Sequence, residues 1–151
     1  MQFYSTNRKT SPVSLREAVV RGLAADRGLF MPEVIRRFPP AFYQNMKEMT
    51  LREISFVVAE AFFGEDVEAG KLKEIVDETL NFDIPLVQVA DNRYSLELFH
   101  GPTLAFKDVG ARFMARLLAY FNKQEGERQV NVLVATSGDT GSAVANGFLD
   151  V

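Results

Sequence analysis

Lys107 is the residue best placed to do chemistry, because it follows the turn "GPTLAF" at the expected start of a long amphipathic helix. Most lysines are solvated surface charges. A lysine at a helix N-terminus, however, feels the positive end of the helix macrodipole, which disfavours the ammonium form, and burial would act in the same direction. Both effects favour a free amine, which is the form that Schiff-base chemistry with an aldehyde or a pyridoxal cofactor requires.

A second candidate site is the loop "TSGDTG", residues 136–141, which precedes a short helical pattern. Backbone N–H groups at a positive helix end, glycines that admit an anion, and hydroxyl groups would suit a carboxylate or a phosphate. The loop matches neither a Walker A sequence nor a G-x-G-x-x-G fingerprint. The alternative is that it only caps the helix, with Asp139 or Thr140 as the N-cap residue. Asp139 disfavours a bound anion unless its carboxylate has a cationic or protonated partner.

The first half of the chain carries helical patterns. The segments "SLRE" and "TLRE" have capping-box spacing and predict helix starts at Ser14 and Thr50. The first helix should run to about Gly22 and the second should stop at Gly64. Apolar residues at helical spacing continue through "AGKLKEIVDETLNF". We therefore expect a small, mostly helical N-terminal domain.

After Ile84 the pattern changes to short β-like runs. The segments "IPLVQVA" and "YSLELF" are separated by the turn residues 91–93 and predict a hairpin. From Lys107 onward the chain reads as a helix packed on a sheet. Its expected apolar stripe contains Val109, Phe113, Leu117, Leu118 and Phe121.

The next elements predict an α/β fold with a doubly wound parallel sheet. The run "VNVLVAT", Val130 to Thr136, is typical of a buried parallel strand, and a helix should span Ser142 to about Asn146. The chain ends at "FLDV", where the next parallel strand should begin. We therefore expect the front portion of a longer protein, whose exposed sheet edge could allow self-association.

Composition excludes several classes of function. A net charge of −3 without a basic run argues against nucleic-acid binding. The sequence has no cysteine, which excludes thiolate sites and cysteine catalysis. Its single histidine, His100, leaves only an all-carboxylate metal site open, and we predict no metal site. The start "MQFYSTNRKT" lacks signal-peptide features, and no stretch reaches membrane-spanning length. A cytoplasmic protein without membrane partners is expected.

Three ordered blocks of the sequence resemble the threonine synthase family. They are "YSTNRKTSPVSLREAVVRGLAADRGLFMPE", "LELFHGPTLAFKDVGARF" and "VATSGDTGSAVANGF". Members of this family are pyridoxal-phosphate (PLP) enzymes of the tryptophan-synthase-β structural class, or fold type II. The resemblance covers nearly the whole chain. It implies an N-terminal domain over residues 1–82, followed by the truncated first part of a PLP-dependent catalytic domain over residues 83–151.

The resemblance also implies roles for single residues. Lys107 would form the internal aldimine with PLP and then act as general base and acid on the substrate. The implied reaction is that of a lyase: O-phospho-L-homoserine and water give L-threonine and phosphate, the last step of threonine biosynthesis. Asp139 would approach the cofactor, with a protonated aldimine or a cofactor hydroxyl as its partner. The remaining loop residues would hold the substrate carboxylate; they are Ser137, Gly138, Thr140 and Gly141.

Two further residues belong to the matching blocks. We expect His100 to be structural and to hydrogen-bond the turn that positions Lys107, with a contact to the substrate phosphate as the weaker option. Arg112, one turn into the helix, could face a phosphate or water, and we expect water. In the family, the loop that binds the cofactor phosphate lies beyond Val151. The chain alone should therefore be inactive and should bind PLP weakly or not at all.

Two other functions stay open at this point. The chain could belong to another PLP enzyme of fold type II, a dehydratase or a β-replacing synthase, but the opening block and "SGDTG" argue against this. It could also be a non-catalytic, stand-alone binding module. Such a module would be expected to complete its sheet or to cover the edge.

Overall fold

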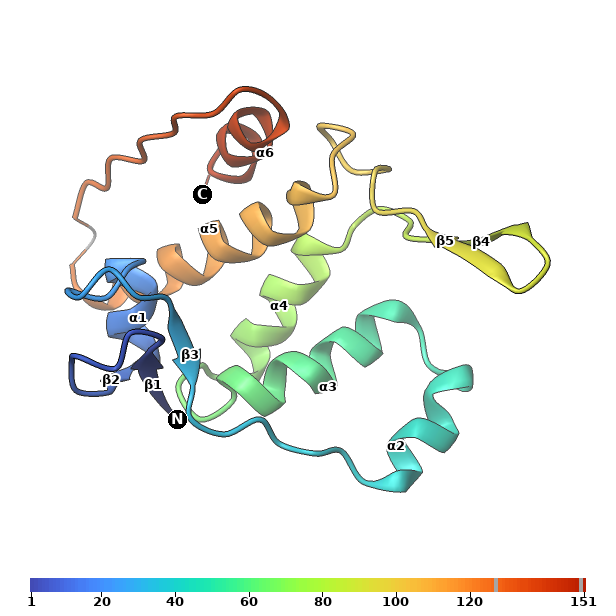
Figure 1. Cartoon of the computed structure of the whole chain (residues 1–151), viewed down its shortest axis with the longest axis horizontal. Coiled ribbons are helices and arrows are strands. Elements are labelled where there is room, and N and C mark those ends of the chain that lie inside the picture. The colour runs from blue at the N-terminus through green and yellow to red at the C-terminus, as the bar shows by residue number, and fades with distance from the viewer. Residues whose placement is uncertain (127, 150) are drawn as a thin grey trace. The chain divides into compact units, whose positions relative to one another are not determined.

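The structure, a computed structural model, describes residues 1–126, 128–149 and 151 (Figure 1). These residues form two compact units, 1–77 and 78–151. Both units combine helices with a small antiparallel sheet, so the α/β class is confirmed in this general sense. The predicted boundary between a domain over 1–82 and a second one over 83–151 stays a prediction.

The first unit begins with a three-stranded antiparallel sheet that the sequence analysis did not predict. Its strands are β1 (Gln2–Ser5), β2 (Val13–Ser14) and β3 (Phe30–Pro32), in the order β2-β1-β3. In the register, Phe3 pairs with Val13 on one side and with Pro32 on the other. The strands contain two to four residues, and such short segments show too little alternation for recognition from sequence.

The helices of the first unit begin where the caps predict. In α1 (Leu15–Arg21), the Ser14 hydroxyl accepts a hydrogen bond from the Glu17 N–H. In α3 (Leu51–Phe63), Thr50 and Glu53 form the full reciprocal capping box, and Gly64 follows the last helical residue. The other helical segments are α2 (Pro40–Asn45), the 3-10 turn η1 (Met46–Glu48) and α4 (Ala69–Thr79), whose last two residues belong to the second unit.

Apolar side chains of α1 and α4 are buried in the first unit. Leu72 of α4 is fully buried, and Leu15 of α1 is 2 % exposed. The spacing of the buried α4 residues follows the helical period, as predicted for this segment. The buried apolar residues of these two helices are Leu15, Ala18, Leu72, Ile75 and Val76.

In the second unit, the predicted hairpin and the helix that starts at Lys107 are confirmed. The hairpin pairs β4 (Leu86–Ala90) with β5 (Arg93–Leu96). Its two-residue turn places Asn92 at φ 55°, a left-handed conformation that asparagine tolerates. Helix α5 (Lys107–Gln124) and helix α6 (Asp139–Gly147) complete the unit. No helix in the described part of the chain has the length and apolar character needed to span a membrane.

The predicted strand from Val130 to Thr136 is not observed. Among the described residues no strand pairs with this segment, and its side chains are exposed, with Leu133 at 93 %. The apolar run therefore forms no strand, because a strand needs a neighbouring strand to hydrogen-bond its backbone N–H and C=O groups. The prediction for the last helix was also inaccurate, since α6 starts at Asp139 instead of Ser142.

Candidate functional site

Lys107 is the first residue of α5, as predicted, and its side chain is 35 % exposed. Its Nζ lies 3.3 Å from Oδ2 of Asp139 and 4.7 Å from the centroid of the Phe106 ring. The residue at the N-cap position is Phe106, and among the described residues no side chain caps this helix start through that position. A primary amine that solvent can reach is thus held at the positive end of a helix, next to a carboxylate.

The turn before Lys107 is closed by backbone hydrogen bonds. The N–H of Leu104 donates to the carbonyl of Gly101 at 3.0 Å, with Pro102 at the second position of the turn. The N–H of Asp108 then donates to the carbonyl of Ala105 at 3.0 Å. Leu104 has φ 56°, which is an uncommon conformation for a leucine. The Pro-containing turn leads the chain directly into the helix.

Asp108 ties this turn to α5, and the sequence analysis missed it. Its side chain is fully buried, and its carboxylate accepts hydrogen bonds from the Thr103 N–H at 2.9 Å and the Thr103 hydroxyl at 2.6 Å. A Cβ at Gly101 would lie 2.6 Å from Asp108 Oδ2, so only glycine fits there. The polar pair Asp108 and Arg112, four residues apart, was the clue that this helix face is not uniformly apolar.

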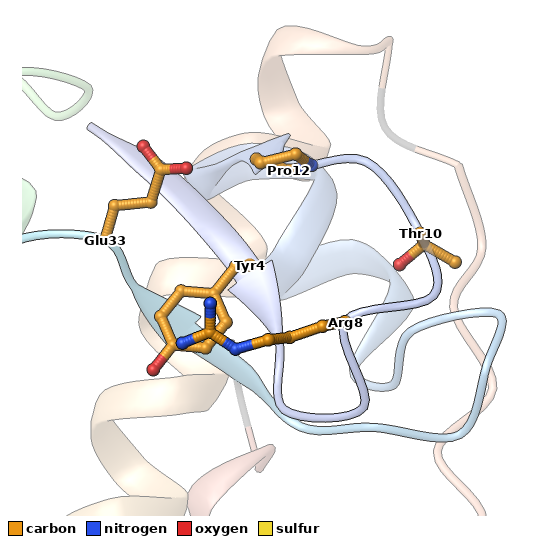
Figure 2. Close-up of a pocket in the computed structure, with 5 residues that line it drawn as sticks. All are labelled: Tyr4, Arg8, Thr10, Pro12 and Glu33. Carbon is orange, nitrogen blue, oxygen red and sulfur yellow. The ribbon is translucent and has the colours of Figure 1, made fainter.

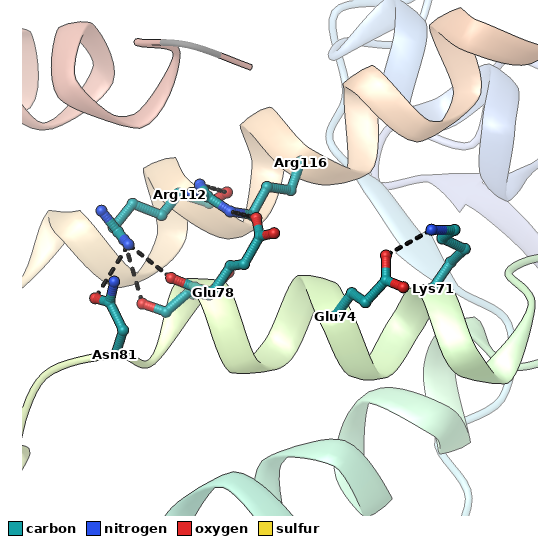
Figure 3. A network of polar contacts seen from close by, with 7 residues as sticks. Lys71, Glu74, Glu78, Asn81, Arg112 and Arg116 are labelled. Atoms are coloured by element: carbon teal, nitrogen blue, oxygen red, sulfur yellow. Dashed lines mark hydrogen bonds and ion pairs between the residues drawn. The ribbon is translucent and has the colours of Figure 1, made fainter.

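The prediction that Arg112 faces water is wrong. Arg112 is only 8 % exposed, and its guanidinium donates to the carbonyl of Glu78 (2.6 Å) and to Oδ1 of Asn81 (3.1 Å), as Figure 3 shows. It also donates to the carbonyl of Thr79 at 3.3 Å. The last carbonyls of α4 have no donor within the helix, and the guanidinium of Arg112 supplies donors to them. Burial lowers the pKa of Arg112, as does the charge of Arg116, while Asp108 and Glu78 oppose this shift.

The predicted stripe of α5 is only partly the buried face. Leu117 and Phe121 are buried as expected, but Val109, Phe113 and Leu118 are only partly buried. The buried side of the helix instead contains Asp108, Arg112 and Ala115 together with Leu117 and Phe121. Polar side chains with internal partners can occupy a buried helix face, and an apolar pattern does not reveal them.

The loop from Thr136 to Gly141 forms the start of α6. Gly138 occupies the N-cap position, and its N–H donates to the Thr136 hydroxyl at 3.3 Å. Neither Asp139 nor Thr140 is the N-cap residue, so that part of the capping alternative is wrong, and no described side chain caps the helix through Gly138. Ser137, Gly138 and Asp139 are exposed. A Cβ at Gly141 would lie 2.8 Å from Cγ2 of Thr136, which explains a glycine at this position.

Asp139 has a partner in the structure, which is the ammonium group of Lys107. The pKa of Asp139 is lowered, first by a hydrogen bond from its own backbone N–H and then by the hydrogen bond and charge of Lys107. The pair therefore stabilises the ionised carboxylate in an exposed position. This contact joins the N-termini of α5 and α6.

Close packing of α6 on α5 brings these two residues together. A Cβ at Gly147 would lie 3.0 Å from the backbone of Ala111, so the two helices approach one another closely there. Ala143 of α6 and Ala115 of α5 are almost fully buried, at 0 % and 1 % exposure. Small residues on both helices thus permit the approach.

His100 does not take its expected position. Its Nε2 lies 2.7 Å from Oε2 of Glu97, and its ring centroid lies 4.7 Å from that of Phe99. Among the described contacts, the turn before Lys107 is bonded by Asp108 and not by His100. The ring instead pairs with a carboxylate three residues earlier, and the weaker option, a contact to the substrate phosphate, stays a prediction.

Two further features of the described residues bear on candidate sites, the distribution of possible metal ligands and a pocket in the first unit. No group of three or more histidine, aspartate or glutamate side chains that could hold a metal ion occurs among the described residues. A pocket of about 380 Å³ lies in the first unit (Figure 2), where Arg8 lies across the ring of Tyr4 at 4.7 Å. The pocket contains none of the predicted site residues; its lining is Tyr4, Arg8, Thr10, Pro12 and Glu33.

Comparison with known proteins identifies relatives for both halves of the chain. Residues 2–80 match the family described as "Threonine synthase N terminus". The threonine synthase of Serratia marcescens is 41 % identical over 148 residues, which are 98 % of this chain and 34 % of that protein. The chain thus spans about a third of the length of such curated relatives.

Solved structures agree with this similarity. The crystal structure of threonine synthase from Escherichia coli has a TM-score of 0.90 at 38 % identity and covers 99 % of this chain and 34 % of that chain. The PLP-bound threonine synthase from Brucella melitensis has a TM-score of 0.88 at 35 % identity, covering 98 % of this chain and 33 % of that chain.

Proposed function

Because the chain belongs to the threonine synthase family through its N-terminal region, we propose that it supplies the N-terminal part and the reactive lysine of a PLP-dependent threonine synthase. The proposed reaction is that of a lyase, which converts O-phospho-L-homoserine and water to L-threonine and phosphate. The observation that carries the proposal is the pairing of Lys107 with Asp139 at the N-terminal ends of two packed helices. The compartment, for which we expect the cytoplasm, remains a prediction from the sequence.

The residues present fit PLP. Lys107 offers an accessible primary amine that would bind the aldehyde carbon of the cofactor, and the carboxylate of Asp139 lies 3.3 Å from that amine, where it would face a protonated group. When bound, PLP serves as an electron sink for the substrate carbanion. Lys107, once released, would move protons at Cα, Cβ and Cγ of the substrate, since its amine lies next to the binding loop.

The loop at the start of α6 is proposed to bind the substrate carboxylate. It is exposed, it lies at the positive end of the α6 dipole, and it carries glycines and hydroxyl groups. The residues in this role are Ser137, Gly138, Thr140 and Gly141. Asp139 would face the cofactor instead, because its carboxylate is directed to Lys107.

The segment from residue 130 to residue 136 is proposed to pair with strands of the remaining part of the catalytic domain. The segment from Val130 to Thr136 is apolar and exposed, and in a doubly wound parallel sheet it would gain strand neighbours. In the chain alone the same segment would promote self-association. Light scattering and amide hydrogen exchange test this self-association. A strictly monomeric chain whose amides exchange slowly from residue 130 to residue 149 would contradict it.

The decisive experiment is an absorbance titration with PLP, followed by borohydride reduction and peptide mapping. We expect the complete protein to form one stable adduct, at Lys107, and to lose threonine formation in Lys107→Ala. The 151-residue chain should bind PLP weakly or not at all and should be inactive. Lys123→Ala is the control, because this lysine lies in the last turn of the same helix. Threonine formation that persists in Lys107→Ala would overturn the proposal.

A further inference from the structure

We infer that Asp108, acting through Thr103, is a positioning residue that fixes the amine of Lys107 opposite Asp139. The inference rests on the proposed role of Lys107. The carboxylate of Asp108 follows Lys107 directly and reaches back across it to Thr103, with hydrogen bonds of 2.9 Å and 2.6 Å. The segment that carries Lys107 is therefore closed into a loop by side-chain hydrogen bonds.

The burial of Asp108 indicates that its contact with Thr103 is a specific part of the fold. A carboxylate at 0 % exposure is costly unless hydrogen bonds satisfy it, and here the two bonds from Thr103 use both oxygens. Gly101 leaves the space that the carboxylate occupies, since a Cβ would lie 2.6 Å from Oδ2. The sequence of the turn is thus adapted to admit Asp108.

The conformation of the turn also requires such a restraint. Leu104 adopts φ 56°, which is unfavourable for a leucine, and the residue is 76 % exposed. Packing of the Leu104 side chain therefore contributes little to holding this conformation. The restraint comes from the backbone bond to Gly101 and from the contact between Asp108 and Thr103.

A different role for Asp108 would be to serve only as counter-charge for Arg112. The two residues lie four positions apart on the buried side of α5, and the charge of Asp108 opposes the effect of burial on the pKa of Arg112. Substitutions at Thr103 separate the two roles. Thr103→Val removes the hydroxyl hydrogen bond to Asp108, while the bond from the Thr103 backbone N–H, the charge of Asp108 and the surroundings of Arg112 stay in place.

The test is carbodiimide cross-linking of Lys107 to Asp139 in the 151-residue chain, quantified by peptide mass spectrometry. The ion pair at 3.3 Å reports the position of the amine and needs no cofactor. We expect Thr103→Val to lower the cross-link yield by about fivefold or more, because small displacements have large effects on reactions between positioned groups. Thr103→Ser should restore the yield, because it keeps the hydroxyl donor.

Two controls accompany these variants. Thr79→Val makes the same chemical change at a buried hydroxyl that has no partner among the described residues, and it should leave the yield unchanged. The pair Lys73 and Asp77, at 2.7 Å in the first unit, provides an internal reference that shows whether the carbodiimide reacts equally with each variant. Circular dichroism shows whether each variant is folded. Because Thr103 is less buried than Asp108, its variants should fold, and Asp108→Asn serves as a second variant.

The outcomes separate this inference from the proposed function. An unchanged yield in Thr103→Val would overturn the positioning role even where PLP binds at Lys107. A reduced yield that Thr103→Ser rescues, with an unchanged reference pair, would support it. Borohydride trapping of PLP on the same variants of the complete protein tests the proposed function. An adduct at another lysine would overturn the proposed function, and the position of the Lys107 amine would then have no bearing on catalysis.

Discussion

The ammonium group of Lys107 lies 3.3 Å from the carboxylate of Asp139, although the two residues are 32 positions apart. Each belongs to the first turn of its helix, and close packing of α5 and α6 brings both helix starts together. A positive helix end disfavours a lysine and favours an aspartate. The carboxylate of Asp139 therefore offsets the unfavourable interaction between the Lys107 ammonium group and the positive end of α5.

The first prediction concerns the titration of Asp139. In Lys107→Met its pKa should rise toward its ordinary value of 3.8, because the hydrogen bond and the charge of Lys107 are lost. The rise should be partial, since the bond from its own backbone N–H, the largest cause of the shift, remains. Carbon-detected NMR titration of the side-chain carboxyl measures this. An equal rise in Lys123→Met would show that the contact with Lys107 is not the cause.

The second prediction concerns acid stability of the first unit. Asp26 accepts hydrogen bonds from Ser5 Oγ (2.6 Å), Lys9 N (2.9 Å) and Gly28 N (3.0 Å), and its pKa is lowered, mainly by Ser5. A lowered folded-state pKa contributes stability above the unfolded pKa, and this contribution is lost as the pH falls through the folded pKa. Asp26→Asn should therefore reduce stability at neutral pH.

The same variant should also flatten the loss of stability between about pH 5 and pH 2. Urea denaturation at a series of pH values, followed by circular dichroism, measures both effects. Glu60→Gln, an exposed carboxylate on α3, is the control. If Asp26→Asn loses as much stability between about pH 5 and pH 2 as the wild type, the contacts of Asp26 do not contribute to that loss.

The third prediction concerns the capping box of α3. Thr50→Ala removes the acceptor for the Glu53 N–H, and we expect a loss of about 1 kcal/mol in the free energy of unfolding. Thr50→Ser keeps the hydroxyl and should remain within a few tenths of a kcal/mol of the wild type. Urea denaturation compares the three proteins. Equal losses in both variants would mean that the methyl group, and not the cap, matters.

The fourth prediction contrasts two glycines in helices of the second unit. Gly147→Ala would bring a Cβ within 3.0 Å of the Ala111 backbone, which cannot rotate away, so the variant should be destabilised and α6 displaced. At Gly110, no described atom lies within 4 Å of the added Cβ. Gly110→Ala should therefore be stabilising, by about 0.5–1 kcal/mol, because alanine favours the helix.

Thermal unfolding measures the opposite signs of these two substitutions. The cross-link between Lys107 and Asp139 should decrease in Gly147→Ala and persist in Gly110→Ala, since only the first alters the contact between α5 and α6. Stabilisation by Gly147→Ala would show that the helices separate without cost.

The sequence by itself determined the helix starts at Leu15, Leu51 and Lys107 and the hairpin turn near Asn92. These features depend on caps, turns and periodicity, which act between residues a few positions apart. For the same reason Lys107 could be placed at a helix start before its surroundings were known. Local chemistry was sufficient for each of these elements.

Only the tertiary structure decided which partners the polar groups found. It buried Asp108 and Arg112 on the α5 face and joined Lys107 to Asp139. It also paired the short strands of the first unit, and it left the apolar segment of residues 130–136 without a ladder among the described strands. The physical reason is that burial and strand pairing depend on which distant segments meet, and local patterns do not specify this.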